Sequence, residues 1–296
     1  MIDSLEPWLK RCTIVIPAKN EARGLNVLLP AIKDQAGSAQ ILVVDDGSND
    51  DTIQVCESNG IKVVRHMRSK GNGAAIKTGA RTAETDIILF MDADGQHDPK
   101  YIRSLLEKMA QGADMVVGAR DRYSQASLGR LAANRFYNRL AGWMVGQKIL
   151  DLTSGMRAVY RDKFLEFLHL LPNGFSYPTT ITMAFFRAGY SVEYIPIRAE
   201  KRLGKSHINL ARDGLRFLLI IFRIGTLYSP LKVFFPISAG LFSTGLFYYL
   251  YTFLTAGRFT NMSALLFTSS IVIFLMGLVS EQINNLQYSL LFKEKE

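Results

Sequence analysis

Cysteine is scarce in this 296-residue chain, which contains only Cys12 and Cys56. Cys12 lies at the start of a predicted strand and Cys56 in a predicted helix, and neither has a neighbour at metal-ligand spacing. This scarcity argues against a disulfide-stabilised scaffold and against a cysteine-based zinc site. We therefore expect two reduced structural thiols in a cytosolic domain.

Charged residues are absent from two long stretches, Val233–Ala256 and Asn261–Ser280. With 24 and 20 residues, each can cross a hydrocarbon core of about 30 Å as a helix. Three tyrosines lie toward the far end of the first stretch, where an aromatic belt is favourable. A buried soluble hairpin is the alternative, but two stretches of this length leave little room for it. The sequence thus predicts an integral, multi-pass membrane protein with transmembrane helices at about 233–256 and 261–285.

Basic residues are almost absent between the two stretches, where Gly257–Thr260 contains only Arg258. The others lie in the N-terminal part and in the tail Lys293–Glu296. This bias predicts that the N-terminal domain and both termini are cytoplasmic. No signal peptide is visible, since Met1–Lys10 is short and mixed in character.

The net charge of +9 is concentrated in Arg198–Arg223, which has seven basic and two acidic residues. This segment leads directly into the first apolar stretch. Anionic lipid head groups or phosphorylated substrates therefore explain the charge better than nucleic acid, which we do not expect as a partner. A narrow polar stripe beside a wide apolar face predicts a juxtamembrane amphipathic helix at 206–229 that lies in the membrane interface. A buried domain helix is the alternative.

Strand and helix patterns alternate through the first half of the chain. Strands are predicted at Thr13–Ile16, Ile41–Asp45, Ile61–Arg65, Ile87–Met91 and Met115–Gly118. Helices are predicted at Ala22–Gln35, Asp51–Ser58, Ala74–Ala83 and Pro99–Gln111. The alternation predicts an α/β domain with a doubly wound, mostly parallel sheet. Ligands of such sheets bind beyond the carboxyl ends of the strands.

Polar clusters follow three of these strands, at Pro17–Glu21, Asp45–Ser48 and Asp92–Asp94. We expect them to converge on one crevice, which makes a binding site more probable than three separate solvated turns. Asp92 and Asp94 follow a buried apolar strand, where a carboxylate must be hydrated, paired or metal-bound. Hard oxygen ligands of this kind suit Mg²⁺ or Mn²⁺ bound to substrate phosphates.

Four motifs in this order resemble family 2 glycosyltransferases of the GT-A fold. They are Ile16-Pro-Ala-Lys-Asn-Glu21, Val43-Val-Asp-Asp-Gly-Ser-Asn-Asp-Asp-Thr52, Asn72-Gly-Ala-Ala-Ile-Lys-Thr-Gly79 and Met91-Asp-Ala-Asp-Gly-Gln-His-Asp-Pro99. The two apolar stretches narrow the resemblance to polyprenyl-phosphate hexosyltransferases, which include dolichyl-phosphate mannose and glucose synthases. The resemblance implies a catalytic domain at 1–205 and a membrane hairpin at 230–296, with a short cytoplasmic tail.

The resemblance also implies roles for individual residues on the donor side. The nucleotide pocket is expected to include Pro17, Ala18, Glu21, Asp45 and Asp46. Carboxylates there can accept hydrogen bonds from base N–H groups, although Glu21 is also explained as an acid favoured at a helix N-terminus. The metal and diphosphate site is expected to include Asp92, Ala93, Asp94 and Gln96. His97 is not assigned, because an isolated histidine is more often an ordinary polar residue.

On the acceptor side the resemblance implies that basic residues hold a phosphate, for which arginine offers planar, bidentate donors. The expected acceptor-phosphate residues are Arg130, Arg135, Ser154 and Arg157. On the donor side Arg120 is expected among the residues that bind the nucleotide sugar, with Arg202 and Lys205 as clamps on the diphosphate. A solvated or lipid-facing basic surface is the alternative for each arginine. Asp94, Arg120 and Asp151 are the expected catalytic residues. Asp151 is in the position of a general base, but an already ionised phosphate acceptor needs little deprotonation, so an orienting role is equally open.

The resulting expectation is an inverting enzyme that transfers a hexose from a nucleotide sugar to a membrane polyprenyl (dolichyl) phosphate. Mg²⁺ or Mn²⁺ is the expected cofactor. A processive polysaccharide synthase is a weaker alternative, because neither tryptophan lies in a Gln-x-x-Arg-Trp motif. A non-catalytic scaffold is disfavoured by the intact Asp92-Ala-Asp94. A dehydrogenase is disfavoured because Gly-x-Gly-x-x-Gly is missing after the first strand. Homo-oligomerisation is plausible, since two spans cannot easily enclose a lipid path.

Overall fold

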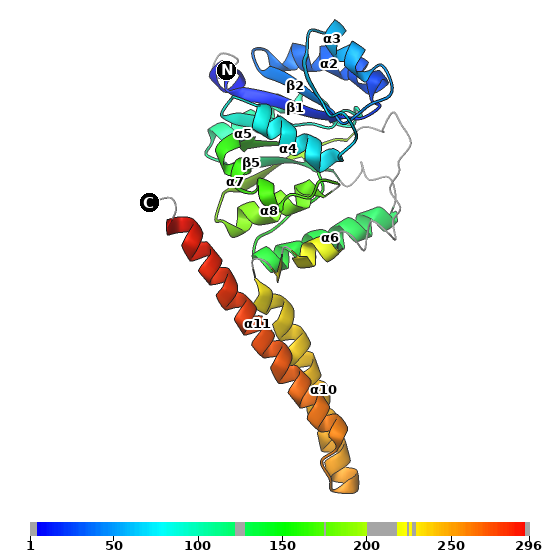
Figure 1. The fold of residues 1–296 in the computed structure, drawn as a ribbon, viewed down its shortest axis with the longest axis vertical. Helices are drawn as coiled ribbons and strands as arrows, with labels where there is room; N and C mark the ends of the chain where they lie inside the picture. The colour runs from blue at the N-terminus through cyan, green and yellow to red at the C-terminus, as the bar shows by residue number, and fades with distance from the viewer. Residues whose placement is uncertain are drawn as a thin grey trace. The chain divides into compact units, whose positions relative to one another are not determined.

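A computed structural model of the chain describes residues 5–121, 128–174, 176–199, 218–223, 225–226 and 229–293 (Figure 1). The chain divides into two compact units. The α/β unit comprises Met1–Leu140 and Gln147–Ile220, and the helical unit comprises Ala141–Gly146 and Ile221–Glu296. Most of the expected juxtamembrane helix at 206–229 lies outside the described residues.

The described part of the α/β unit contains a seven-stranded sheet, in the spatial order β3-β2-β1-β4-β6-β5-β7. The strands are β1 (Cys12–Ala18), β2 (Gln40–Asp45), β3 (Lys62–Arg65), β4 (Ile87–Phe90), β5 (Met115–Arg120), β6 (Arg157–Tyr160) and β7 (Val192–Ile197). Strand β6 is antiparallel to its neighbours β4 and β5, and every other pairing is parallel. The sheet is therefore mostly parallel, with one reversed strand inside it.

Helices cover both faces of this sheet (Figure 1). They are α1 (Glu6–Lys10), α2 (Ala22–Ala36), α3 (Thr52–Ser58), α4 (Asn72–Thr82), α5 (Tyr101–Ala110), α7 (Arg161–Glu166) and α8 (Tyr177–Arg187). Helix α6 (Leu128–Val145) follows β5 in the chain, and none of its described residues belongs to either hydrophobic core of the sheet. Side chains alternate across each strand, so β1 directs Ile14 and Ile16 to one core and Val15 to the other. The first core includes residues of α1, α2, α3 and α5, and the second includes residues of α4, α7 and α8.

Helix α4 approaches the sheet closely because it has a glycine at the contact. A Cβ atom at Gly79 would lie only 2.2 Å from Cγ1 of Val15. The glycine thus allows the helix backbone to pack against β1, and the motif Asn72–Gly79 has a structural role at this point.

The predicted strands and helices of the first half are confirmed, with ends shifted by no more than two residues. Strands β6 and β7 were not predicted from the sequence. Strand β6 has only four residues and starts with Arg157, while β7 is an edge strand in which exposed and buried residues mix. Neither gives the continuous apolar run that marks the central strands.

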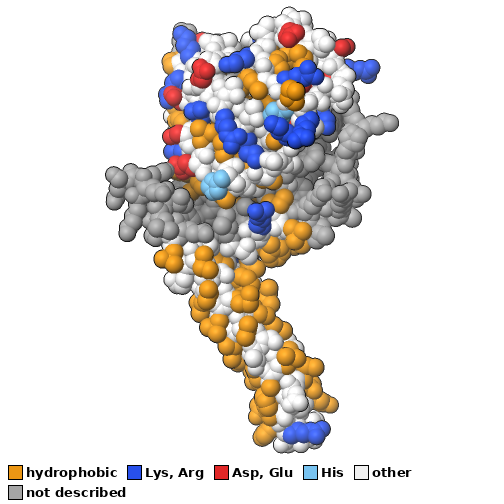
Figure 2. All heavy atoms as spheres, in the orientation of Figure 1, with side chains coloured by type: hydrophobic (Ala, Val, Ile, Leu, Met, Phe, Trp, Pro, Cys, Tyr) orange, Lys and Arg blue, Asp and Glu red, His pale blue; other side chains and the backbone are white. Residues whose placement is uncertain are grey.

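The helical unit contains an antiparallel hairpin formed by α10 (Pro230–Ala256) and α11 (Asn261–Lys293). Both helices are long and apolar enough to cross a membrane. Figure 2 shows hydrophobic side chains over most of their visible surface. Only 11% and 17% of the most apolar segments of the two helices is buried within the structure, as expected for helices that face lipid rather than a protein core.

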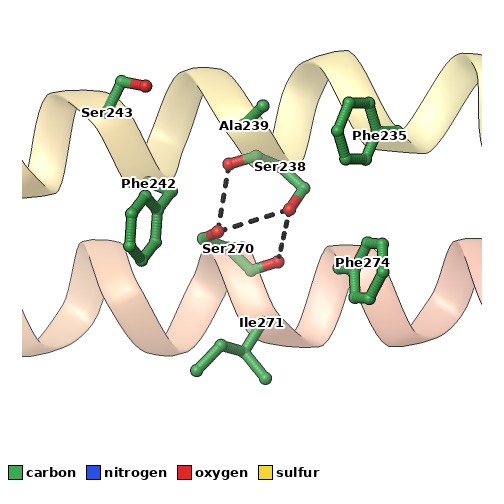
Figure 3. A pocket seen from close by; sticks show the side chains of 8 residues that line it. All are labelled: Phe235, Ser238, Ala239, Phe242, Ser243, Ser270, Ile271 and Phe274. Carbon is green, nitrogen blue, oxygen red and sulfur yellow. Dashed lines mark hydrogen bonds between the residues drawn. The ribbon is translucent and has the colours of Figure 1, made fainter.

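A pair of serines joins the two helices of the hairpin (Figure 3). The hydroxyl of Ser238 donates to the carbonyl of Ser270 and the hydroxyl of Ser270 donates to the carbonyl of Ser238, both at 3.0 Å. Both serines are buried. Gly245 and Gly277 allow close approach, because a Cβ there would lie 3.0 Å from Leu266 and 2.8 Å from Phe234. Small residues and interhelical hydrogen bonds are typical of helix packing in membranes.

Polar contacts also fix the base of the hairpin. Nζ of Lys232 donates to the carbonyls of Trp143 and Met144 at 3.3 and 3.2 Å, in the last turn of α6. A lysine at a helix C-terminus satisfies carbonyls that have no partner within the helix. Asn284 of α11 donates to the carbonyl of Thr226 at 3.2 Å. The end of α6 and the chain before α10 are therefore both tied to the hairpin.

Candidate active site

One edge of the sheet collects the predicted site residues. The carboxyl ends of β1, β2, β4 and β5 lie at this edge, because these strands share one direction. Strand β6 runs the other way, so its first residue and the segment before it reach the same edge. The reversed strand thus brings residues 151–157 to the polar clusters that follow β1, β2 and β4.

Asp92 and Asp94 follow β4 directly and are held by tight packing around their backbone. The backbone N–H of Gln96 donates to Oδ1 of Asp94 at 3.1 Å, which closes a turn. A Cβ at Gly24 of α2 would lie 2.5 Å from the carbonyl oxygen of Ala93. The glycine lets α2 press on the residue between the two carboxylates, so both are fixed to a rigid strand end.

The donor set at this turn fits a divalent cation whose remaining ligands are waters or substrate phosphates. Asp92, Asp94 and Gln96 offer hard oxygen ligands. No group of three or more His, Cys, Asp or Glu side chains suited to a metal ion occurs among the described residues. Mg²⁺ commonly binds through one or two carboxylates plus substrate phosphates, and two carboxylates beside an amide match that pattern.

His97 lies behind the carboxylate pair. It is only 4% exposed, and its Nδ1 lies 3.9 Å from Oδ2 of Asp92. Burial lowers the pKa of His97 to about 4, and the opposing attraction of Asp94 does not compensate, so the ring is neutral at pH 7. Its backbone forms a bridge with Ala199, just beyond β7.

Asp45, the last residue of β2, and Asp46, directly after it, are both buried beside the expected nucleotide pocket. Asp45 is 0% exposed and accepts from the backbone N–H of Ser48 at 3.1 Å. Asp46 accepts four hydrogen bonds at 2.7–2.8 Å. The donors are the Nδ1 of His66, the hydroxyl of Ser69 and the backbone N–H groups of Lys70 and Gly71. Burial opposes ionisation, but these hydrogen bonds outweigh it and lower the pKa of Asp46.

This arrangement corrects the expected role of Asp46. An ionised carboxylate has about four lone-pair sites, and protein donors occupy four. Asp46 therefore orders the loop at 66–71 instead of accepting a hydrogen bond from a nucleotide base. His66 was not predicted as part of this region; its Nε2 lies 2.9 Å from the hydroxyl of Thr78, so the ring links Asp46 to α4. A histidine that follows a short strand gave no signal for this contact.

The residues after β1 reach the same loops. Pro17 and Ala18 are the last residues of β1 and are buried. Glu21 is the N-cap residue of α2 and makes no capping hydrogen bond with its side chain. The side chain of Glu21 therefore does not cap α2 in the way that an N-cap carboxylate usually does. Its backbone N–H donates to the hydroxyl of Thr52 at 3.1 Å, which ties this turn to the loop after β2.

Arg120 and Asp151 form a bidentate ion pair. Nε of Arg120 lies 2.8 Å from Oδ2 of Asp151, and Nη2 lies 3.0 Å from Oδ1. Burial would raise the pKa of Asp151, but the charge and hydrogen bonds of Arg120 and the backbone N–H of Thr153 outweigh it, and the pKa is lowered. Asp151 is thus an ionised, fully paired group that orients Arg120. Asp92 and Asp94 add to the field that raises the pKa of Arg120.

Arg157 lies in the interior, contrary to the expected contact with an acceptor phosphate. It is 0% exposed and donates to the carbonyls of Ser154 and Pro178 and to the hydroxyl of Thr182. Its guanidinium also lies 5.6 Å from the ring centre of Tyr177. These contacts direct the charge toward α8. Ser154 is likewise fully buried. Both residues therefore build the wall of the site and do not face a ligand.

Helix α6 presents the basic side chains that were expected to hold a phosphate. Of these, Arg135 is exposed. Arg139, one turn further along and not among the expected residues, is exposed as well, and Phe136 and Trp143 of the same helix are 58% and 50% exposed. Arg130 is within α6, but its side chain is not among the described residues. The expected clamps Arg202 and Lys205 also lie outside the described residues.

Solved structures share this arrangement of strands and helices. Glucosyl-3-phosphoglycerate synthase from Mycobacterium tuberculosis, in complex with Mn²⁺ and uridine-diphosphate-glucose, superimposes with a TM-score of 0.62 at 20% identity. The match covers 76% of this chain and 83% of that chain. The α/β unit therefore has the GT-A-like fold of glycosyltransferases.

Sequence comparisons give the family. Residues 13–168 match Glycosyl transferase family 2, and residues 229–286 match the GtrB C-terminal hairpin. Glycosyltransferase AglJ from Haloferax volcanii is 29% identical over 79% of this chain and 78% of its own length. Polyprenol monophosphomannose synthase from Mycolicibacterium smegmatis is 29% identical over 68% of this chain and 82% of its own length. The chain belongs to glycosyltransferase family 2.

Proposed function

We propose that this glycosyltransferase moves a hexose from a nucleotide sugar, of the GDP-mannose or UDP-glucose type, to a polyprenyl (dolichyl) phosphate at the cytoplasmic face of a membrane. The transfer inverts the configuration at the anomeric carbon and depends on a divalent cation. The observation that carries this proposal is the occurrence, in one chain, of a carboxylate pair at the sheet edge and a hairpin long enough to span a membrane. A lipid-linked acceptor explains why an enzyme with this site has such a hairpin.

The names of relatives support the acceptor class. The mycobacterial relative is named for the synthesis of a polyprenol monophosphomannose, and the match includes most of its length. The same class of acceptor accounts for the basic, partly apolar face of α6, since arginine binds phosphate and aromatic side chains favour the membrane interface.

Asp92, Asp94 and Gln96 would hold the cation together with the donor diphosphate. When bound, the cation neutralises the charge that builds on the leaving nucleoside diphosphate. Arg120 lies in the field of both aspartates and adds a fixed positive charge for the same diphosphate or for the acceptor phosphate.

The acceptor needs no strong base, because a phosphate monoester is ionised near pH 7. Its oxygen attacks the anomeric carbon on the side opposite the departing diphosphate. The work of the protein is therefore to position two charged reactants. Asp151 contributes by fixing Arg120, which its lowered pKa and full set of hydrogen bonds support.

The test offers the purified full-length protein a panel of radiolabelled nucleotide sugars with dolichyl or undecaprenyl phosphate in detergent. We expect one sugar to give label that extracts into organic solvent, and we expect chelation of divalent cations and Asp94→Asn to abolish it. Asp98→Asn is the matched control, because Asp98 pairs with Lys100 at 2.6 Å and caps the turn into α5.

Each part of the proposal fails on a different result. Absence of organic label with every sugar, in a preparation that binds nucleotide sugar, would favour a scaffold. Label that persists after chelation would refute the role of the cation while leaving the transfer intact.

A further inference from the structure

The carboxylate of Asp92 sits between two groups to which the proposed function gives no role. On one side is Gly155, in the segment before β6. A Cβ atom at Gly155 would lie 2.2 Å from Oδ2, 2.8 Å from Cγ and 2.9 Å from Oδ1 of Asp92. Any larger residue would collide with the carboxylate, so the space at Gly155 is filled by Asp92 itself.

On the other side is the imidazole of His97. Its Nδ1 is the atom of the ring that faces Asp92, at 3.9 Å from Oδ2. This nitrogen is buried and has no hydrogen-bond partner among the described residues. A buried polar atom without a partner costs free energy, so its retention here requires an explanation.

The backbone of His97 is fixed as well. It forms an antiparallel bridge with Ala199, beyond the end of β7. The ring is 4% exposed, so it has little freedom to turn toward solvent. Asp92, by contrast, keeps 35% of its side chain exposed. The imidazole of His97 is thus enclosed by protein, whereas the carboxylate of Asp92 is partly open to solvent.

We propose that His97 and Gly155 position the Asp92 carboxylate for the divalent cation. Gly155 leaves the room in which the carboxylate lies, and Nδ1–H of His97 donates to Oδ2, which turns Oδ1 toward the cation. Shortening the observed 3.9 Å to a hydrogen bond requires a shift of about 1 Å. Hydrogen bonds to ligating carboxylates commonly orient them and strengthen metal binding.

This inference rests on the proposed metal-dependent function and assigns His97 and Gly155 as positioning residues. The probe is Mn²⁺ alone, titrated into the full-length protein in detergent and followed by the electron paramagnetic resonance signal of the free ion. We expect His97→Ala to weaken Mn²⁺ binding by about 10- to 100-fold, the range typical of residues that support metal ligands. Gly155→Ala should weaken binding at least as much, because its methyl group displaces Oδ2.

Conservative variants separate positioning from mere packing. His97→Asn places an amide N–H near the position of Nδ1 and should restore most of the affinity. His97→Gln places its amide near Nε2 and should not. In an Asp92→Asn background, His97→Ala should cause no further loss, because the histidine acts only through that carboxylate.

Matched controls exist in the chain. His169→Ala removes an exposed histidine, and Gly174→Ala adds a Cβ that has no atom within 4 Å. Both should bind Mn²⁺ like the wild type. The backbone of Gly155 is not in the left-handed region, so alanine there changes contacts and not chain conformation.

Three results would overturn the inference. The first is wild-type affinity in both His97→Ala and Gly155→Ala. The second is a nitrogen coupling from His97 in the spin-echo spectrum of bound Mn²⁺, which would make the histidine a direct ligand. The third is a wild-type protein that does not bind Mn²⁺, which also overturns the metal dependence in the proposed function. The first two leave that dependence intact.

Discussion

Replacement of Asp151 by asparagine separates an orienting carboxylate from a catalytic base. The carboxylate accepts Nε and Nη2 of Arg120 at 2.8 and 3.0 Å and the backbone N–H of Thr153 at 3.0 Å. Asparagine retains one acceptor oxygen and presents an N–H₂ group in place of the other. In either amide orientation at least one donor loses its acceptor, and Arg120 loses its counter-ion.

The expected loss follows from these contacts. Breaking a buried ion pair by removing one partner costs about 3–5 kcal/mol. The Arg120 side chain is 26% exposed, so water compensates in part and we expect about 2–3 kcal/mol. For a domain of this size that corresponds to a decrease in Tm of roughly 4–12 °C.

The loss should depend on pH in a defined direction. The folded state lowers the pKa of Asp151 below its unfolded value of about 3.9. The stabilisation is therefore complete above about pH 5 and is lost as the pH falls through the folded-state pKa. The difference in Tm between wild type and Asp151→Asn should be constant from pH 5 to 8 and should shrink in more acidic buffer.

The assay is thermal unfolding in detergent, followed by intrinsic fluorescence, with transfer activity measured in parallel. Asp114→Asn is the matched control, because Asp114 pairs with Lys163 at the opposite edge of the sheet. It should lower Tm without a specific loss of activity in the folded fraction. An Asp151→Asn protein with unchanged Tm at pH 7 would refute the reasoning. A wild-type activity that rises between pH 5 and 8 with a step that Asp151→Asn removes would restore the general base.

Two further substitutions test features in each unit. Arg157→Met removes a buried guanidinium that donates to two carbonyls and a hydroxyl. We expect the loss of about 3 kcal/mol of buried hydrogen bonding to lower the Tm by more than 5 °C, while the KM for the acceptor stays unchanged in the folded fraction. A selective rise in that KM would mean that Arg157 contacts the acceptor. Ser238→Ala removes an interhelical hydrogen bond of the hairpin and should lower the free energy of unfolding in detergent by about 1 kcal/mol. Ser243→Ala is the control and should lower it less, because the hydroxyl of Ser243 points away from α11 (Figure 3). Equal losses in the two variants would refute the role of the serine pair.

The architecture could be predicted because it depends on local patterns. Buried parallel strands are continuous apolar runs, and helices between them have a 3.6-residue period, so each element leaves its own mark on the sequence. The polar clusters after β1, β2 and β4 were expected to converge for the same reason, since parallel strands place their carboxyl ends at one edge. The two uncharged stretches likewise indicated the hairpin without knowledge of any contact.

The roles of single carboxylates and arginines could not be predicted in this way. Asp46 and Asp94 are both aspartates in a loop after a strand, yet protein donors fill the lone-pair sites of Asp46. Arg120 and Arg157 are both arginines near the site, yet Arg157 is fully buried against α8. Whether a charged group faces a ligand or the interior depends on partners that are distant in sequence.

The sequence by itself determined the strands and helices of the first half of the chain, the two long apolar helices and the sheet edge where the polar clusters gather, because these follow from periodicity and strand order. The tertiary structure alone decided that β6 is reversed, which brings Asp151 beside Arg120 and Gly155 beside Asp92. It also decided that His97, adjacent to Gln96 in sequence, faces Asp92 from a buried position. The contacts of Asp151 with Arg120 and of Gly155 with Asp92 depend on how residues more than 30 positions apart pack, and hydrophobic patterning does not encode that geometry.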